Sequence, residues 1–465
     1  MIEKKTKIIA TIGPSSEGVL EDLILSGVDL FRFNTKHNEI SWHNKRIKEA
    51  QKAADKLKAH VGILIDLQGP EIRIETREES EIAVKKGDLI AIGGDFKAKD
   101  IVLAVSNKTV FENLFKGDPL LIDDGFIELK VVQKKGGRVI AEVVEGGVIK
   151  NKKSLNLPEK KLNLSSLIDH DLKSLDMMAK EKIDFVALSF VRDKNDVDVL
   201  RKEMEKRKIK AEIISKIENR EAVSNIDEII DCSDAIMIAR GDLGIEVPIE
   251  ELAYLQRSII YKSRIKRKPV IVATQMLYSM TENPRPTRAE ATDIANAVFN
   301  RTDAVMLSEE TAIGKYPAKS ARTMAKIVKF NEEKTDFVKL SSLPNTPTEL
   351  MIDAVVSMLG LSKGMDIIAV FTESGYTAKV LSSFRPKAKI IAITSNQKTA
   401  ENLSLSYGVI PCLVSFPLFD SKAVKLAIER LKKEKIVSPG RELIIVSGKL
   451  EKRPELINSF SIVKT

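Results

Sequence analysis

Short apolar runs alternate with amphipathic helical segments over most of the chain. The runs are nearly continuous and rich in Val, Ile and Ala, which is typical of strands buried on both faces of a parallel sheet. Eight strand–helix units predict a (β/α)8 barrel of the TIM type. The alternative is a doubly wound open sheet, which shows the same alternation. The eight runs lie at residues 7–12, 29–33, 61–67, 185–190, 212–217, 235–239, 269–273 and 304–307.

The stretch between the third and fourth runs has a different pattern. Residues 72–155 alternate in short segments with turn signals such as Gly136-Gly137. This pattern predicts an all-β domain inserted after the third barrel strand. The entry at Gly69-Pro70 and the exit at 156–158 are candidate hinges, so we expect the insertion to act as a lid.

A third part follows a polar stretch that begins near residue 331. Its alternation of strands and helices predicts a C-terminal α/β domain with an open sheet. We expect strands at 366–371, 389–393, 409–414 and 442–446, and helices at 349–361 and 377–384. The predicted domains are the barrel at 1–71 and 156–335, the lid at 72–155 and the C-terminal domain at 336–465.

The composition is that of a globular protein, with 43% hydrophobic and 30% charged residues. No apolar stretch approaches the ~18 residues of a membrane span, and the charged start runs into a strand, so we expect neither a membrane segment nor a signal peptide. Cys232 and Cys412 are far apart and form no metal-ligand pattern, which favours a cytoplasmic protein with reduced thiols.

The net charge of +9 is a small excess of 75 basic over 66 acidic residues. The two signs are mostly interleaved along helices, which is typical of solvated helix faces. Aromatic residues make up only 5% of the chain, so the sequence offers few stacking residues and no nucleic-acid partner is expected. A mild basic excess does suit an enzyme of multiply anionic substrates.

Polar residues gather where the predicted barrel strands end. Lys216 and Glu218 are two residues apart, so both side chains leave the same face of one strand. Asp242 follows the next strand between Gly241 and Gly244, and glycines let a backbone come close to a ligand. Glu218 and Asp242 can together hold Mg²⁺ or Mn²⁺ through carboxylate oxygens. The alternative is a structural ion pair of Lys216 with Glu218.

Further polar residues end the other strands. Thr274 follows the seventh strand, Arg32 lies in the second, Asp66 ends the third, and Arg73 follows the Gly69-Pro70 break. Two arginines near a divalent-metal site indicate a phosphate-bearing substrate. The sequence contains neither a Walker A motif nor a kinase glycine-rich loop. We therefore predict a phosphoryl-transfer enzyme that holds any nucleotide in another way.

Together these segments resemble the pyruvate kinase family. The resemblance implies a Mg²⁺-dependent transferase that moves a phosphoryl group from phosphoenolpyruvate to ADP, giving pyruvate and ATP in the last step of glycolysis. It also implies a homotetramer with a sugar-phosphate effector site. The matching segments occur in the family's order at residues 6–14, 32–34, 69–73, 122–125, 215–219, 239–248, 273–280 and 284–290.

The resemblance also implies roles for single residues. The phosphoenolpyruvate contacts would be Arg32, Lys216, Gly241, Asp242 and Thr274, of which Arg32, Lys216 and Thr274 would be catalytic. The nucleotide contacts would be Asn34, His37, Arg73 and Lys153. The divalent-metal ligands would be Glu218 and Asp242, and a monovalent cation would lie near Asn34, Lys36, Asp66 and Leu67.

One departure from the family pattern concerns potassium. Lys36 stands where the family has a serine that binds K⁺. Our hypothesis is that the Lys36 ammonium replaces the ion beside Asp66, because two cations at that separation repel each other. A K⁺ requirement is therefore doubtful. The alternative is that Lys36 turns outward and the cation site is lost. Glu309, at a position where glycine is usual, adds an unexplained carboxylate near the barrel rim.

The C-terminal domain carries a candidate effector site. Thr372, Ser374, Gly375 and Thr377 connect a strand to a helix, and hydroxyls with a glycine at a helix start can cradle phosphate. The alternative is an ordinary helix cap. The loop that closes over effectors in the family is not recognisable at 448–460. Two other functions stay open, namely a mutase or aldolase of phosphoenolpyruvate or pyruvate, and an inactive sensor of a phosphorylated metabolite.

Overall fold

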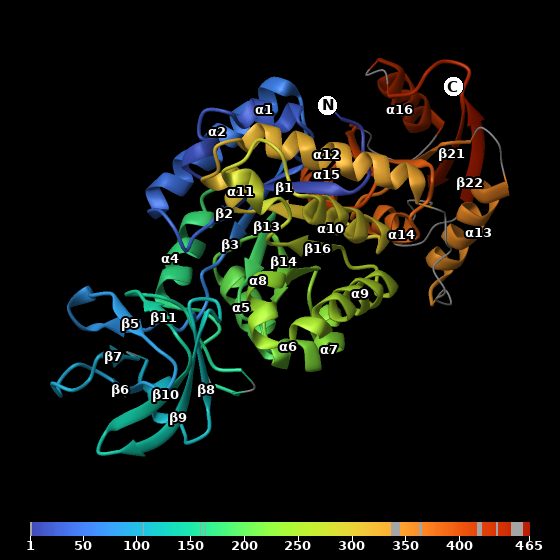
Figure 1. Cartoon of the computed structure of the whole chain (residues 1–465). Helices are drawn as coiled ribbons and strands as arrows, with labels where there is room; N and C mark the ends of the chain where they lie inside the picture. The colour runs from blue at the N-terminus through green and yellow to red at the C-terminus, as the bar shows by residue number, and fades with distance from the viewer. Residues whose placement is uncertain are drawn as a thin grey trace.

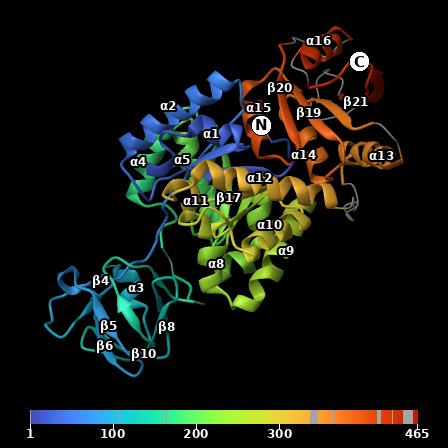
Figure 2. The same cartoon turned by 45° about the horizontal axis from the view of Figure 1, so that its top comes forward.

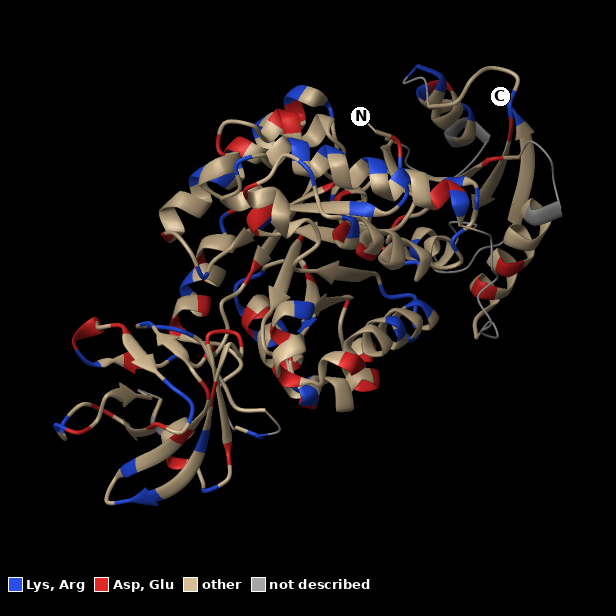
Figure 3. Ribbon diagram, viewed as in Figure 1, with Lys and Arg blue, Asp and Glu red and all other residues tan. Residues whose placement is uncertain are grey.

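The computed structural model describes residues 2–105, 107–158, 160–162, 164–335, 345–361, 365–415, 421–433, 436–447 and 459–465. A central barrel carries the C-terminal domain at one end and a β-rich insertion at the other (Figure 1). A second view shows the same separation, with the N-terminal segment beside the C-terminal domain (Figure 2). Basic and acidic residues alternate along the ribbon of all three parts (Figure 3).

Eight parallel strands close into the predicted barrel in the order β1-β17-β16-β15-β14-β13-β3-β2. Each expected run coincides with one strand to within two residues, and the sheet is closed, so the doubly wound alternative is wrong. Inward side chains such as Leu64, Phe185 and Ile214 fill the interior, which makes it a packed core. The strands are β1 (Lys7–Thr11), β2 (Leu30–Asn34), β3 (Gly62–Asp66), β13 (Phe185–Leu188), β14 (Glu212–Ile217), β15 (Ala235–Ala239), β16 (Val270–Ala273) and β17 (Ala304–Leu307).

Helices surround the barrel and bury their apolar faces against the outside of the strands. Thr287 and Glu290 cap the start of α10 reciprocally in a capping box. The helices are α1 (Leu20–Leu25), α2 (Ile40–Leu57), α4 (Asp169–Met178), α5 (Lys194–Lys206), α6 (Arg220–Ser224), α7 (Ile226–Cys232), α8 (Arg240–Glu246), α9 (Ile249–Ile265), α10 (Arg288–Phe299), α11 (Glu309–Ala312) and α12 (Pro317–Lys334). None of the described helices combines the length and apolar character that a membrane crossing needs.

The insertion after β3 is mostly β, with its own core. Its main sheet has the order β12-β8-β9-β10-β6-β7-β4, and β11 pairs with β5. The prediction of an all-β insertion missed one short helix, α3 (Lys108–Glu112), which Asn107 caps through its side chain. The strands are β4 (Glu75–Thr76), β5 (Ile82–Val84), β6 (Leu89–Gly93), β7 (Leu103–Ala104), β8 (Pro119–Ile122), β9 (Ile127–Lys135), β10 (Arg138–Glu145), β11 (Gly147–Ile149) and β12 (Leu155–Asn156).

The insertion is called the lid below, after its expected role, and the two chain segments that connect it to the barrel run side by side. The Ile74 backbone N–H donates to the Lys153 carbonyl at 3.0 Å, and Leu155 donates to Ile72 at 2.9 Å. Arg73 and Ser154 form an antiparallel bridge between them. We call these two segments, 72–74 and 153–155, the hinge ribbon.

The C-terminal domain is built on an open sheet of order β20-β19-β18-β21-β22. Four expected strands are present and parallel, but the antiparallel edge strand β22 was not predicted. Residues 448–458, within the stretch where the effector-closing loop of the family is not recognisable, lie outside the described part of the chain. The elements are α13 (Pro347–Leu361), β18 (Ile367–Phe371), α14 (Tyr376–Ser383), β19 (Lys389–Thr394), α15 (Gln397–Asn402), β20 (Val409–Leu413), α16 (Ser421–Lys433), β21 (Glu442–Ser447) and β22 (Ser459–Lys464). The domain boundaries at 72, 156 and 336 stay predictions.

Candidate active site

The candidate site centres on Lys216, near the carboxyl end of β14 on the rim that faces the lid. Its Nζ lies 2.8 Å from Glu218 Oε1 and 3.3 Å from Asp66 Oδ1, and it donates to Ser189 Oγ at 2.7 Å. Burial acts to lower the pKa of Lys216, but the Asp66 and Glu218 carboxylates outweigh it and raise the pKa above its ordinary value. Lys216 is therefore a fixed positive charge at any ordinary pH.

Arg32 adds a second cation on the other side of Asp66. Both Nε and Nη2 of Arg32 lie 2.7 Å from Asp66 Oδ2, and Nη1 donates to Thr11 Oγ1 at 2.9 Å. Burial acts to raise the pKa of Asp66, but Lys216 and Arg32 hold that pKa below its usual value. Asp66 is thus an ionised carboxylate that holds two cations in place at the barrel mouth.

Glu218 and Asp242 form the carboxylate pair that the sequence predicts. Glu218 Oε2 accepts from the backbone N–H of Phe190 at 2.6 Å, and Phe190 has a left-handed backbone with φ 54°. Burial and the neighbouring Glu218 carboxylate raise the pKa of Asp242 to about 7. Two close, buried carboxylates disfavour each other's charge unless a cation lies between them, so this donor set fits a divalent metal.

A Mg²⁺ ion at this pair would take its other ligands from substrate and water. The described part of the chain contains no cluster of three or more His, Cys, Asp or Glu residues suited to a metal. Such a sparse protein shell is typical of Mg²⁺ sites that bind substrate phosphates. The residues present therefore fit a substrate-bridged divalent ion.

The segment around Asp242 differs from its expected form. Arg240 to Glu246 make the short helix α8, and the sequence analysis predicted no helix at this position. Gly241 is in ordinary helical space, and a Cβ there would meet Thr274 at no less than 3.7 Å. The packing of the protein itself would therefore tolerate a larger residue at position 241. The glycine leaves open space beside Thr274 that a bound ligand could fill.

Thr274 carries backbone strain that the sequence does not reveal. Thr274 and Gln275 directly follow β16 and have φ values of 69° and 53°. A β-branched residue in the left-handed region is uncommon, and such strain gathers at functional sites. The Thr274 hydroxyl accepts from the Gly241 N–H at 2.8 Å and donates to the Ala273 carbonyl at 2.6 Å. These bonds fix the hydroxyl over the start of α8.

The predicted nucleotide contacts lie where the barrel meets the lid, and their cations are paired with carboxylates. Arg73 Nη2 lies 2.9 Å from Glu71 Oε2, and Lys153 Nζ lies 2.7 Å from Asp123 Oδ1. Burial and the nearby charges of Lys36, Arg32 and Arg73 lower the pKa of His37. The group therefore forms a positively charged region in which Glu71 and Asp123 act as internal counter-charges.

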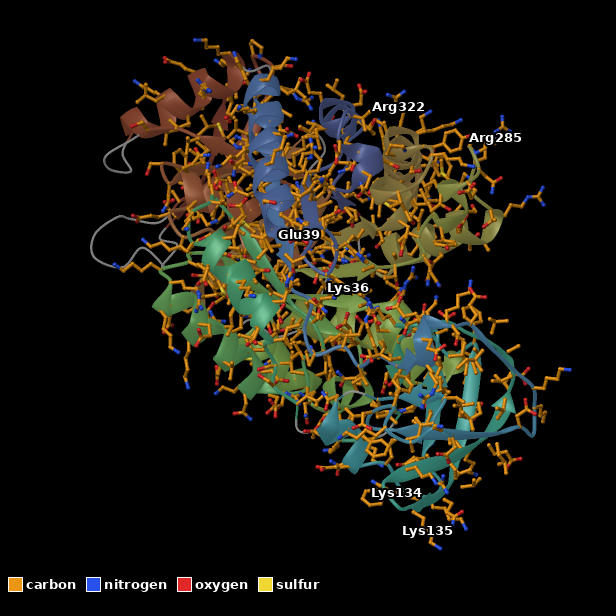
Figure 4. The ribbon with its side chains drawn as sticks, turned by 90° about the vertical axis from the view of Figure 1, so that its left-hand side faces the viewer. Lys36, Glu39, Lys134, Lys135, Arg285 and Arg322 are labelled. Atoms are coloured by element: carbon orange, nitrogen blue, oxygen red, sulfur yellow. The ribbon has the colours of Figure 1, made fainter. Side chains whose placement is uncertain are left out.

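Lys36 also points into this region, but its ion pair is not with Asp66. Its Nζ lies 2.9 Å from Glu71 Oε1, and its backbone N–H donates to Asn34 Oδ1 at 3.2 Å. Figure 4 labels Lys36 between the barrel and the lid. The Leu67 carbonyl accepts the Ser189 hydroxyl at 2.7 Å. The ammonium thus lies beside Glu71, because Arg32 and Lys216 already occupy Asp66.

Several contributing residues escaped the sequence reasoning. Ser189 accepts a hydrogen bond from Lys216, and Thr11 accepts one from Arg32. The only feature of the sequence that could have indicated these two residues is a hydroxyl side chain near the end of a strand. Beside the carboxylate pair, a cavity of about 190 Å³ extends between the barrel rim and the returning lid segment. Glu309 is exposed at the start of α11, away from the core.

The predicted effector residues form a tightly bonded loop before α14. Thr372 Oγ1 accepts from the Gly375 N–H at 2.9 Å, and Gly375 has φ 84°. Thr372 and Thr377 are buried, whereas Ser374 is exposed. One backbone donor of the loop is therefore used internally, in a turn before the helix, and the N-cap residue Gly375 provides no side-chain cap for α14.

Comparisons with known proteins agree on one family. Residues 3–321 match the family model "Pyruvate kinase, barrel domain", and residues 351–463 match "Pyruvate kinase, alpha/beta domain". The chain is 38% identical to a pyruvate kinase of Geobacillus stearothermophilus, covering 96% of this chain and 78% of the relative. It is 36% identical to a pyruvate kinase of Clostridium perfringens, covering 96% of each.

A solved structure gives the same result. The crystal structure of a pyruvate kinase from Cryptosporidium parvum superimposes with a TM-score of 0.92 at 32% identity, covering 99% of this chain and 96% of that one. Its similarity spans the barrel, the lid and the C-terminal domain together. The chain belongs to the pyruvate kinase family of phosphotransferases.

Proposed function

We propose that this chain transfers the phosphoryl group of phosphoenolpyruvate to ADP through the residues of the Lys216 site. The observation that carries this proposal is the buried Lys216, held between Asp66 and Glu218 and facing Asp242. Charge in phosphoryl transfer spreads over the equatorial oxygens, so catalysis depends on fixed cations in a site that excludes water. Lys216 and Arg32 would contact the transferred group from two sides.

Glu218 and Asp242 would hold a divalent ion, Mg²⁺ or Mn²⁺, between them. The bound ion would supply Lewis acidity and a template for the phosphate oxygens. Asp242 would then be ionised, because the ion outweighs the repulsion from Glu218. Lys216 keeps Glu218 in position through its 2.8 Å contact with Oε1.

Proton delivery to the enolpyruvate carbon would involve Thr274. Its hydroxyl is fixed by Gly241 and Ala273, so it can orient a proton donor or water above the start of α8. A hydroxyl of ordinary pKa is a poor acid alone, so Thr274 acts by positioning. The lid, on its hinge ribbon, would close over the site and keep water from taking the phosphoryl group.

The nucleotide phosphates would bind where the barrel meets the lid, through Asn34, His37, Arg73 and Lys153. This assignment is supported by the positive charges around His37. It is also supported by the ion pairs of Arg73 with Glu71 and of Lys153 with Asp123, which hold both cations in this region. Incoming phosphates would displace Glu71 from Arg73 and Asp123 from Lys153. The binding of ADP and the closing of the lid would then be coupled.

The Lys36 ammonium would supply the positive charge that the family recruits as potassium. Lys36 shares Glu71 with Arg73, and its charge partly opposes the rise in the pKa of Asp242 that burial and Glu218 cause, so it reaches toward the reacting groups. A bound K⁺ beside this ammonium would be repelled. We therefore propose catalysis without a monovalent-cation requirement, with the ammonium beside Glu71.

The test is pyruvate formation from phosphoenolpyruvate, measured with and without ADP. Phosphoryl transfer requires ADP, whereas a mutase or aldolase would consume phosphoenolpyruvate without it, and that outcome would reject the proposal. Tetramethylammonium as the sole monovalent cation should support full activity. The Lys36→Ser variant should gain activation by K⁺, while Lys45→Ser, which changes an exposed lysine on α2, should not. A strict K⁺ requirement of the unmodified chain would reject the Lys36 assignment alone.

We also propose that the chain forms a cytoplasmic homotetramer. The large apolar side chains of Ile249, Tyr254 and Ile313 are 72%, 73% and 65% exposed, which suits a subunit interface. A sugar phosphate at Thr372, Ser374, Gly375 and Thr377 would be the effector. Light scattering after size exclusion, and activity with and without sugar phosphates, test these two points.

A further inference from the structure

Around Arg385, the junction between the barrel and the C-terminal domain gathers several basic side chains close together. Arg264 of α9, Arg301 after α10 and Arg385 after α14 meet there near one another. Asp303 lies 2.6 Å from Arg385 Nη2 and also accepts the Tyr407 N–H at 3.3 Å. The Arg264 and Arg385 guanidinium groups thus lie beside one aspartate whose two oxygens already accept hydrogen bonds, which is unfavourable in a buried interface without a further anion.

Arg264 shows the imbalance most directly. Arg264 is only 7% exposed, and its Nε has no hydrogen-bond partner. Its Nη2 donates a long hydrogen bond of 3.3 Å to the Ser383 carbonyl. Burial, together with Arg385 and Arg301, lowers the pKa of Arg264 to about 9. A small cavity of about 10 Å³ lies beside Arg264 and Arg385. The buried hydroxyl of Ser406, which also lines this small cavity, lacks a hydrogen-bond partner. Buried donors and positive charge therefore exceed the available acceptors.

A second cavity, of about 40 Å³, is larger than the one beside Arg264, and Arg385 lines both cavities. We call it the junction cavity. Its lining includes Lys5, Arg301, Glu332, Arg385, Lys387 and Tyr407. Glu332 is the one carboxylate among these lining residues, and it accepts from the backbone N–H groups of Lys5 and Thr6. Four basic side chains thus surround the space, and the carboxylate beside them is already engaged.

We propose that the junction cavity binds a tetrahedral oxyanion, either inorganic phosphate or the phosphoryl end of a small monoester. One water needs roughly 10–15 Å³ of such space, so about 40 Å³ accommodates several oxygen-sized atoms. Arginine and lysine side chains are the groups that complement phosphate oxygens. Binding would also neutralise the excess charge that Arg264 and Arg385 carry in the interface.

The bound anion would connect three parts of the chain. Lys5 precedes β1, Arg301 follows α10 of the barrel, and Lys387 belongs to the C-terminal domain. The parts are already in contact, since Lys5 Nζ donates to the carbonyls of Pro386 and Lys387. A ligand at their meeting point would stabilise the docked arrangement of the C-terminal domain on the barrel. This site is separate from the Lys216 site and from the loop before α14.

Thermal unfolding of the full chain tests the proposal. Inorganic phosphate, compared with potassium chloride at equal ionic strength, should raise the unfolding midpoint by about 3 °C or more at saturation. Lys387→Ala and Arg301→Met should each remove most of that rise, whereas Lys329→Ala, on the exposed face of α12, should not. Lys216→Met and Thr377→Val should retain it, because they alter the two other phosphate sites.

A second measurement locates the anion. Crystals soaked in tungstate, a heavy tetrahedral oxyanion, should show anomalous density between Arg301 and Lys387. Glycerol 3-phosphate distinguishes the sources, since a larger shift than inorganic phosphate assigns the cavity to a monoester, and an equal shift assigns it to the free ion. Absence of tungstate from the junction cavity, or a phosphate shift that survives in both Lys387→Ala and Arg301→Met, would overturn the proposal.

Discussion

Replacing Lys216 with methionine removes the cation that holds two buried carboxylates of the active site. Lys216 Nζ lies 2.8 Å from Glu218 and 3.3 Å from Asp66, and both acids are almost fully buried. At an effective dielectric constant of about 20, the two attractions are about 6 and 5 kcal/mol before desolvation is subtracted. Removing one partner of a buried ion pair costs about 3–5 kcal/mol, so the unfolding midpoint should fall by roughly 6–20 °C.

The same change should separate metal binding from catalysis. Without the lysine, Glu218 and Asp66 present more negative charge, so Mg²⁺ should bind the variant about tenfold more tightly. The turnover number should nevertheless fall by at least about 10³-fold, because the main fixed cation at the transferred phosphoryl group is gone. Titration calorimetry with Mg²⁺, scanning fluorimetry and the coupled pyruvate assay measure these three quantities.

The control for this experiment is Lys173→Met, which changes an exposed lysine on α4. It should leave the midpoint, the Mg²⁺ affinity and turnover unchanged. If Lys216→Met lowers turnover by less than tenfold, or if Mg²⁺ binds the variant more weakly, the electrostatic role given to Lys216 is wrong.

Three further outcomes follow from the site and its surroundings. Glu71→Gln frees Arg73 from its carboxylate, so the KM for ADP should fall by up to about fivefold, and a rise would contradict the counter-charge role. Thr274→Ser should keep activity because it retains the hydroxyl and relieves the branched side chain at positive φ, whereas Thr274→Val should lose most turnover with little change in phosphoenolpyruvate affinity. Burial raises the pKa of Glu246 above its value in the unfolded chain, so stability falls as pH rises from the unfolded pKa to the raised folded pKa and is constant above it; Glu246→Gln should unfold at a higher temperature than the unmodified chain at about pH 8 and at the same temperature near pH 4.

The barrel strands were predictable because they are buried on both faces, which gives short continuous apolar runs, and the number of runs favoured a closed barrel over an open sheet. Strand ends were located to within two residues for the same reason. The edge strand β22 was missed because the side chains of Phe460 and Ile462 are 42% and 51% exposed, so burial imposes little pattern on it. The helix α3 was missed because a single turn with one cap is too short to show a period.

The candidate site was predictable in its residues but not in its contacts. Lys216, Glu218 and Asp242 stand out as charges at strand ends, and the barrel topology brings them together. The pairing of Lys36 with Glu71 depends on a side-chain choice between two carboxylates, which residue spacing cannot decide. The strained backbone of Thr274 is likewise set by tertiary packing, since its sequence resembles any strand end.

The hinge ribbon has a consequence for how such a molecule can arise by descent. The lid leaves the barrel and returns through neighbouring segments, with Ile74 bonded to Lys153 and Arg73 bridged to Ser154. A closed module with adjacent ends and a core of its own can enter a loop between two barrel units without shifting the register of any strand. An ancestral barrel could therefore gain, exchange or lose the whole insertion in one genetic step and still close around the same eight strands.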